Sequence, residues 1–173
     1  MANVLKDLGP CWVIWDPNGV NATFKKTFGG VFFRYEELRA PIKRDQAGLT
    51  DVDEVTTGAI NPELECPFTQ EENTKLVNLF GNVAGAAAYL KVSNPVGEAM
   101  LASAKLVIVK PIENGVVSTT ATEWLYIYRA VPRITMEVAW DNSSQRTTKT
   151  MFKGFPDDIS GRQGVMWSYG TLP

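Results

Sequence analysis

The sequence predicts a mainly β fold: an antiparallel β sandwich or barrel with one flanking α-helix (about residues 69–80) and a long polar loop (about residues 40–58). Short runs of alternating apolar and polar residues, turn signals between those runs, and one apolar stripe at helical spacing support this prediction. The 173 residues, 45% of them hydrophobic, suffice for one domain with a full core. We expect a single domain over residues 1–173, with an N-terminal arm over about 1–10 and a C-terminal tail over about 157–173.

Alternation predicts the strands. Apolar side chains share one face of most runs, as in a sheet with one buried and one solvated face. The runs are residues 20–25, 31–36, 60–68, 106–109 (apolar on both faces), 124–131, 134–140 and 147–155. Because proline cannot donate to a ladder, Pro62 and Pro67 predict that the run 60–68 lies at an edge or is broken. Turn signals separate the runs at Asp16–Gly19, Gly29–Gly30, Asn114–Gly115 and Asp141–Asn142, as in antiparallel hairpins.

The helix is predicted from its ends and its stripe. Thr69 can cap the first turn, and Glu72 completes a capping box. Leu76, Leu79 and Phe80 form the apolar stripe, and Gly81 follows as a stop. Residues 82–104 are rich in alanine, glycine and serine without a clear period, so a loop and an irregular helix both stay open there.

Charge and composition exclude several classes of function. A net charge of -2 offers no basic face for holding nucleic acid by its phosphates. The absence of histidine removes Ser/His/Asp and Cys/His catalysis and most zinc sites. No apolar stretch approaches the ~20 residues of a membrane span, and no signal-peptide pattern begins the chain, so we expect synthesis in the cytoplasm and no membrane insertion. Cys11 and Cys66 are expected to be buried free thiols rather than a disulfide.

The acidic stretch 44–58 is the first candidate for a chemical site. A calcium loop beginning at Asp45 would need oxygen ligands where Ala47 and Leu49 stand, and one beginning at Asp51 meets Val55. Asp53 and Glu54 are neighbours, and strand neighbours point to opposite faces, so they do not form the facing carboxylate pair of a glycosidase. We therefore predict no catalytic residue, no metal site and no cofactor.

Aromatic residues give a second candidate. Trp124, Tyr126 and Tyr128 share one face of a predicted strand, where they could stack on a sugar or on single-stranded nucleic acid. Aromatics alternating on a strand are more often anchors of a core or of a subunit interface, and we favour that interpretation.

The stretch 45–58 also carries a family resemblance. It has the form D-Q-x-G-x-T-x-V-D-x-V-x-T-G, with these residues in order: Asp45, Gln46, Gly48, Thr50, Val52, Asp53, Val55, Thr57 and Gly58. In this the chain resembles the major tail (tail tube) proteins of long-tailed bacteriophages. Further likenesses are a G…A-x-L-x-x…P strand (Gly97, Ala104, Leu106, Pro111), an A-x-P turn (Ala130, Pro132), a closing strand with a P-D turn (Phe152, Phe155, Pro156, Asp157) and a glycine-bearing tail (Gly164–Gly170).

The resemblance covers residues 30–170 and implies a structural virion protein that is not an enzyme. It implies a tail tube fold, six subunits to a ring, and rings stacked into a tube that conducts DNA into the host without binding it. The implied partners are other copies of the chain, a tape-measure protein, a tail terminator and a distal tail protein, and the implied location is the virion tail. Two alternatives stay open: a related phage morphogenesis protein, such as a tail terminator or the inner tube of a contractile system, and a carbohydrate-binding β sandwich.

Two sets of residues follow from this resemblance. A closed tube needs contacts that repeat along its axis, and a polar loop can supply them. We expect intersubunit contacts from Asp45, Gln46, Thr50, Asp53 and Thr57. We expect Glu63 and Glu65 to face the lumen, because an acidic or neutral lining lets DNA pass.

Overall fold

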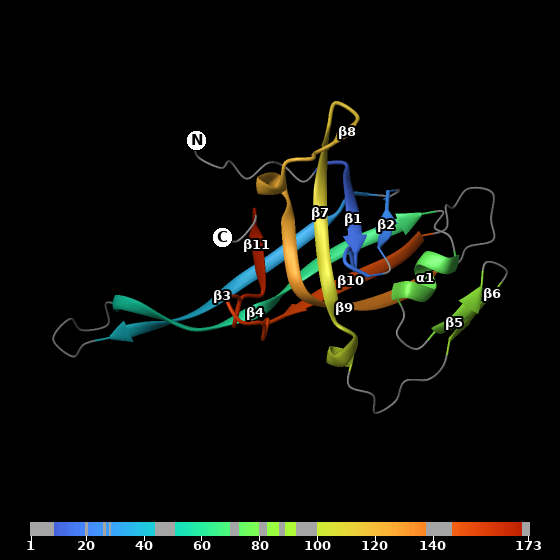
Figure 1. The fold of residues 1–173 in the computed structure, drawn as a ribbon. Helices are drawn as coiled ribbons and strands as arrows, with labels where there is room; N and C mark the ends of the chain where they lie inside the picture. Colours follow the sequence, from blue (N-terminus) through green and yellow to red (C-terminus); the bar gives the residue numbers. More distant parts are fainter. Residues whose placement is uncertain are drawn as a thin grey trace.

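Two layers of antiparallel strands make up most of the described chain, which is mainly β as the sequence predicts (Figure 1). The computed structural model describes residues 9–19, 21–25, 27, 29–43, 51–69, 73–79, 83–86, 89–92, 100–137 and 147–170. The strands are β1 (Cys11–Trp15), β2 (Ala22–Phe24), β3 (Phe32–Lys43), β4 (Asp51–Thr69), β5 (Val83–Ala86), β6 (Tyr89–Val92), β7 (Lys105–Glu113), β8 (Val116–Val117), β9 (Leu125–Glu137), β10 (Thr147–Phe155) and β11 (Trp167–Tyr169). The helices are α1 (Asn73–Leu79) and the 3-10 turns η2 (Met100–Ser103) and η3 (Ala121–Glu123).

One nine-stranded sheet bends to make both layers. Its order is β2-β1-β7-β9-β10-β4-β3, with β11 on β9 and β8 on β7, while β5 and β6 pair separately. Strand β9 belongs to both layers, since Leu125–Ala130 pairs with β7 and Arg129–Glu137 pairs with β10. Between Ile127 and Ala130, β9 has one residue more than its partner β7. This bulge lets the strand turn from one layer into the other, as Figure 1 shows.

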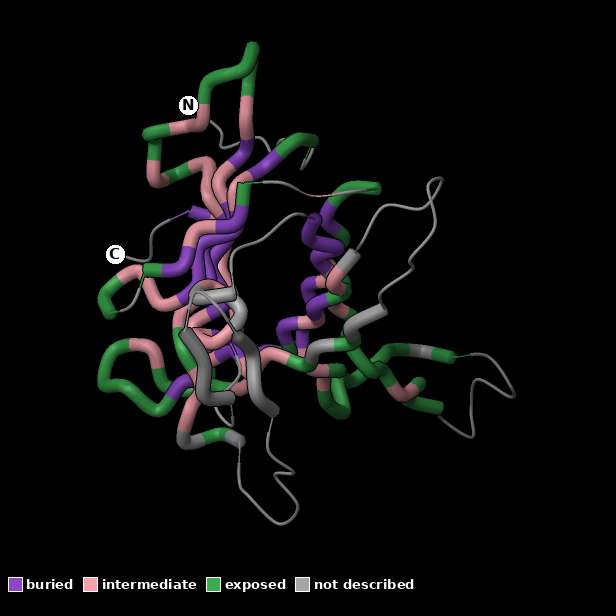
Figure 2. Tube along the Cα trace, turned by 90° about the vertical axis from the view of Figure 1, so that its right-hand side faces the viewer, coloured by how far each residue is buried: buried purple, intermediate pink, exposed green. Residues whose placement is uncertain are grey.

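The core lies between the layers. Trp15 of β1 stacks on Phe152 of β10 with ring centroids 5.5 Å apart. Thr27, just after β2, forms an antiparallel bridge to Phe68 of β4. The chain next to β2, at one end of the strand order, therefore contacts β4 near the other end. Figure 2 shows the buried residues on both layers. Each large apolar side chain buried there contributes roughly 1.5–3 kcal/mol to folding.

The predicted alternation is confirmed where the structure describes it. Ala22 and Phe24 are buried in β2, as are Leu64, Cys66 and Phe68 in β4. Strand β10 spans the predicted 147–155. The turns at 16–19 and 114–115 are also present, and both residues of Asn114–Gly115 have the positive φ of a tight hairpin turn.

Strand β4 lies inside the sheet, so the expectation that Pro62 and Pro67 place it at an edge or break it is wrong. Ile60 pairs with Glu36 and Glu63 pairs with Arg34, so β4 has two residues between these pairs where β3 has one. Pro62 is one of the two and lies in this β-bulge, where no ladder hydrogen bond is needed. Pro67 lies past Glu65, the last β4 residue paired with β3, and pairs with β10 only. Pro62 is therefore tolerated by a bulge inside the sheet, and Pro67 lies where β4 no longer has β3 beside it.

Several predicted boundaries are also corrected. Thr69 is the last residue of β4 rather than a helix cap, and the helix spans only Asn73–Leu79; Glu72 and Phe80 lie outside the described residues. The runs 124–131 and 134–140 form one strand through Glu137, because β10 pairs continuously along it. Ala130 and Pro132 therefore lie within β9 rather than in a turn.

The remaining segments also take part in the fold. For residues 82–104 the sequence predicts a loop or an irregular helix. In the structure, β5 and β6 form an antiparallel hairpin within this range. In the expected C-terminal tail, β11 pairs with β9, and Trp167 packs on Phe33 with ring centroids 5.0 Å apart. Cys11 and Cys66 are free and buried, as expected. No helix in the described part of the chain is long and apolar enough to cross a membrane.

Candidate functional site

A two-stranded hairpin projects from the sheet where the sequence predicts a polar loop. We call residues 36–43 of β3 and 51–60 of β4 the hairpin arm. Strand β10 pairs with β4 only over Glu63–Thr69, so the two strands of the hairpin arm pair only with each other and extend away from the layers (Figure 1). At about 3.3 Å per residue, ten residues of β4 reach about 30 Å. The expected loop over 40–58 is thus corrected to strands on both sides of residues 44–50, which lie outside the described residues.

Cross-strand contacts hold the hairpin arm together. Arg39 Nη1 lies 3.7 Å from Glu54 Oε2, and Lys43 Nζ lies 3.7 Å from Asp51 Oδ1. Exposed ion pairs of this kind are screened by solvent and contribute little to stability. The β-branched residues of β4 favour an extended backbone. Since both faces are solvated, the segment shows no apolar alternation, and the sequence pattern is that of a loop.

Two of the predicted contact residues bond within the hairpin arm. The Thr57 hydroxyl donates to the Leu38 carbonyl oxygen across the two strands, at 3.2 Å. Asp53 Oδ1 accepts from the Glu54 backbone N–H at 2.8 Å. Thr57 therefore ties β4 to β3. Asp45, Gln46 and Thr50 lie outside the described residues.

The hairpin arm also exposes large apolar side chains. Four of them are between 40% and 49% exposed: Leu38, Ile42, Val55 and Ile60. A two-stranded ribbon is only marginally stable alone, and leaving apolar surface in water forgoes roughly 25 cal/mol per Å². The hairpin arm therefore presents a surface that gains stability when another chain covers it.

Glu63 and Glu65 lie on the outer face of the second layer, among cations. The register puts Glu63 beside Arg34 and Lys153, and Glu65 beside Phe32 and Met151. Across β10, Met151 is paired with Arg133 of β9. We call this outward surface the basic face; its members are Phe32, Arg34, Glu63, Glu65, Arg133, Lys149, Met151 and Lys153. Its four cations exceed its two carboxylates, so the expected acidic pair does not make an acidic surface.

The aromatic row at the start of β9, with Trp124 just before the strand, lies on the outer face of the first layer. Trp124, Tyr126 and Tyr128 follow one another with ring centroids 6.2 Å apart at each step. Lys110 Nζ lies 3.6 Å from the centre of the Trp124 ring, and the Arg162 guanidinium 4.6 Å from that of Tyr128. Both outer rings thus already hold a cation over one face, which disfavours a stacking platform for sugars.

The Trp124 and Tyr126 side chains also hydrogen-bond to the segment that precedes them. Trp124 Nε1 donates to the Ser118 carbonyl oxygen at 3.1 Å, and the Tyr126 hydroxyl donates to the Ala121 carbonyl oxygen at 3.4 Å. Burial raises the pKa of Tyr126 and lowers that of Lys110. The aromatic row is therefore largely enclosed by its own chain, in agreement with an anchoring role.

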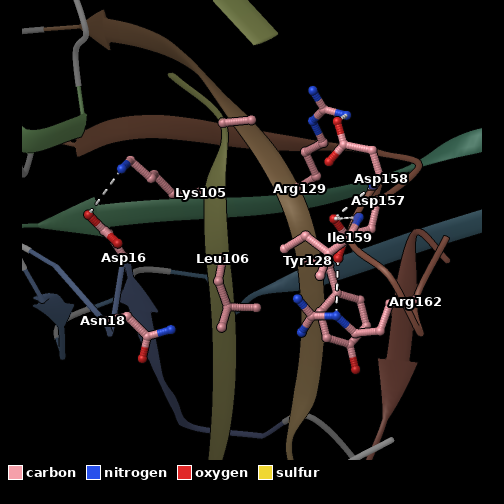
Figure 3. Close-up of a pocket in the computed structure, with 11 residues that line it drawn as sticks. Asp16, Asn18, Lys105, Leu106, Tyr128, Arg129, Asp157, Asp158, Ile159 and Arg162 are labelled. Carbon is pink, nitrogen blue, oxygen red and sulfur yellow. Dashed lines mark hydrogen bonds and ion pairs between the residues drawn. The ribbon is translucent and has the colours of Figure 1, made fainter. Parts of the chain in front are cut away.

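A pocket of about 270 Å³ opens between the turn after β1 and the loop after β10. Its acidic groups point at cations (Figure 3). Arg129 Nη1 lies 2.8 Å from Asp158 Oδ2, and Lys105 Nζ lies 3.7 Å from Asp16 Oδ2. Each of these two carboxylates is paired with a cation of the pocket.

The third acid of the pocket organises the loop after β10. Asp157 is buried, and its Oδ1 accepts from the backbone N–H groups of Asp158 and Ile159 at 2.9 and 3.4 Å. Its Oδ2 lies 3.2 Å from Arg162 Nε; the geometry is that of an ion pair rather than a hydrogen bond. Among the described residues, no three histidine, cysteine or acidic side chains form a group able to hold a metal ion.

The basic face was not predicted from the sequence pattern. Lys149 and Lys153 are visible at even spacing in the run 147–155, but their position beside Glu63 depends on the pairing of β10 with β4. Compared with known proteins, the chain matches no family model and no curated protein. The hairpin arm contains residues 51–58, the second half of the pattern D-Q-x-G-x-T-x-V-D-x-V-x-T-G.

Proposed function

We propose that this chain is the tail tube subunit of a long-tailed bacteriophage, a structural protein rather than an enzyme. The observation that carries the proposal is the hairpin arm: a ribbon that leaves the sheet, exposes four large apolar side chains, and contains residues 51–58 of the tail tube motif. A monomer gains little from such a ribbon, whereas a polymer gains buried surface at every repeat.

In this proposal, six subunits form a ring and the rings stack into a tube in the virion tail. The subunit is made in the host cytoplasm and assembles with a tape-measure protein, a tail terminator and a distal tail protein. DNA passes through without specific binding, which agrees with a net charge of -2. Asp45, Gln46, Thr50 and Asp53 contact a neighbouring subunit, and Thr57 also ties the two strands of the arm together.

Electron microscopy of the purified chain tests the proposal. Negative staining should show long tubes or hexameric rings at micromolar to millimolar concentration. A variant in which a short Asn-Gly turn replaces residues 38–57 should keep the fold, because β10 pairs with β4 only from Glu63 onward, but should form no tubes. A wild-type chain that stays monomeric at all concentrations, or that binds glycans on an array, would contradict a tube subunit.

A further inference from the structure

The hairpin arm and the basic face carry opposite charges. The hairpin arm has five carboxylates and two cations, a net charge of -3. The basic face has four exposed cations, Arg34, Arg133, Lys149 and Lys153, and two half-buried carboxylates. No ion pair joins these four cations to another described side chain. Two exposed surfaces of opposite sign on one chain are suited to contact between copies.

The hairpin arm cannot reach the basic face of its own chain. Both surfaces belong to β3 and β4: the basic face contains Phe32 and Arg34 with Glu63 and Glu65, and the arm continues the same two strands outward. The two strands stay paired with each other out to Lys43 and Asp51, so the arm leads away from its own base and does not fold back onto it (Figure 1). The partner that brings the charges together must be a second copy.

We propose that the hairpin arm of one copy docks on the basic face of the next copy. This inference rests on the proposed function and names the receiving surface of the assembly contact. A hollow of about 180 Å³, lined in part by Phe32 and Met151, lies in the basic face. Phe32 is 62% exposed, so the hollow offers apolar surface to the apolar side chains of the arm, while the surrounding cations meet its carboxylates.

The contact is of the head-to-tail type. The arm and the face are different surfaces, so each copy that uses its arm leaves its own basic face open for another copy. Such heterologous contacts repeat into rings or filaments instead of stopping at a dimer. Because the charges are exposed, salt screens them, and assembly should weaken as ionic strength rises.

Charge reversal tests the docking. The face variant carries Lys149→Glu and Lys153→Glu, and the arm variant carries Glu36→Lys and Asp53→Lys, two acids that form no ion pair with a described residue. Each variant alone should lower the yield of sedimentable polymer by about tenfold or more. Both pairs of changes in one chain should restore it. An equimolar mixture of the two variants should also assemble, because the arm of each then matches the face of the other.

A matched control adds charge elsewhere. Thr119→Glu with Thr122→Glu places two negative charges at exposed positions outside both surfaces, and should assemble as the wild type does. Circular dichroism checks that each variant is folded. If the face variant with two glutamates does not fold, the milder Lys149→Gln, Lys153→Gln variant is used in its place.

The outcomes separate the two proposals. If wild-type tubes form and the folded face variant assembles equally well, the docking is overturned and the tube subunit stands. The same holds if neither the combined chain nor the mixture restores assembly. If the wild-type chain forms neither rings nor tubes, both proposals fail.

Discussion

The rings of Phe24 and Phe68 stack with centroids 4.2 Å apart and planes 20° apart, which joins β2 to β4 across the core. These strands belong to different layers, and both rings are almost fully buried. The pair therefore holds together the two sides of the bent sheet.

Replacing Phe68 with alanine should destabilise the protein strongly. Removal of a buried phenylalanine ring costs about 3–5 kcal/mol, from lost burial and from the cavity left behind. Urea denaturation of the Phe68→Ala variant measures the loss. Phe32→Ala, which removes an exposed ring, should change the free energy of unfolding by less than about 0.5 kcal/mol. Equal effects at the two positions would contradict the placement of the core.

Gly154→Ala should also destabilise the fold. A Cβ at this position would lie 2.7 Å from Pro62 Cγ and 2.8 Å from Ile127 Cγ2, and such overpacking costs about 1–3 kcal/mol. Gly58→Ala is the matched control, because a Cβ there meets nothing within 4 Å; it should be neutral or slightly stabilising. Thermal denaturation of both variants makes the comparison, and a Gly154→Ala protein as stable as the wild type would be the opposing result.

Thr150→Val should stabilise the protein. The Thr150 side chain is fully buried, and its hydroxyl has no hydrogen-bond partner among the described residues. Replacing an unsatisfied buried hydroxyl with a methyl group of similar shape should add about 1 kcal/mol. The free energy of unfolding in urea measures the gain. The exposed Thr135→Val serves as control, and a loss of stability at position 150 would point to a polar partner.

The two buried thiols should make stability fall at high pH. Burial raises the pKa of Cys11 from 9.0 to about 11, and burial, followed by the nearby Cys11 and Glu65, raises the pKa of Cys66. Above about pH 9 the unfolded chain releases thiol protons that the folded chain keeps. The free energy of unfolding should therefore decrease from about pH 9 toward pH 11, by up to about 1.4 kcal/mol per pH unit for each thiol.

The Cys11→Ala variant isolates one of these contributions. It should show a smaller loss of stability between pH 8 and pH 10 than the wild type, even though its stability at pH 8 is lower. Urea denaturation at the two pH values gives both slopes. Identical slopes would mean that Cys11 ionises equally in the folded and unfolded chains.

Apolar residues of the hairpin arm should matter for assembly but not for folding. Leu38 and Val55 are 45% and 49% exposed, so serine at both positions should alter the stability of the free subunit by less than about 0.5 kcal/mol each. Assembly should fall because the contact loses apolar burial. Sedimentation and negative-stain microscopy measure it, with Val116→Ser, exposed on the β7–β8 hairpin, as control. Normal tubes from the Leu38→Ser, Val55→Ser chain would exclude an apolar contribution from the arm.

Local patterns were enough to predict the fold class and most strands. Alternation at Leu64, Cys66 and Phe68 reports which side chains share a face, and a folded sheet buries that face whatever its neighbours are. The turn at Asn114–Gly115 is likewise local, because these two residues accept the backbone conformation that a tight hairpin requires. The same is true of the run 147–155.

Where pairing partners decide the outcome, the sequence pattern was insufficient. Pro62 predicts an edge or a break, yet a bulge opposite β3 accommodates it inside the sheet. Residues 51–58 have no apolar alternation, yet pairing with β3 makes them a strand. Strand partners are set by contacts between residues far apart in the chain, which a single sequence does not display.

The sequence by itself determined that this is a mainly β protein with an apolar core, no histidine and the motif D-Q-x-G-x-T-x-V-D-x-V-x-T-G over residues 45–58. Only the tertiary structure decided that the second half of this motif projects as a hairpin arm, and that Glu63 and Glu65 stand among cations. Composition and alternation are properties of neighbouring residues along the chain. The charge and the shape of the basic face arise only when β9, β10, β4 and β3 lie side by side. That arrangement is a product of folding.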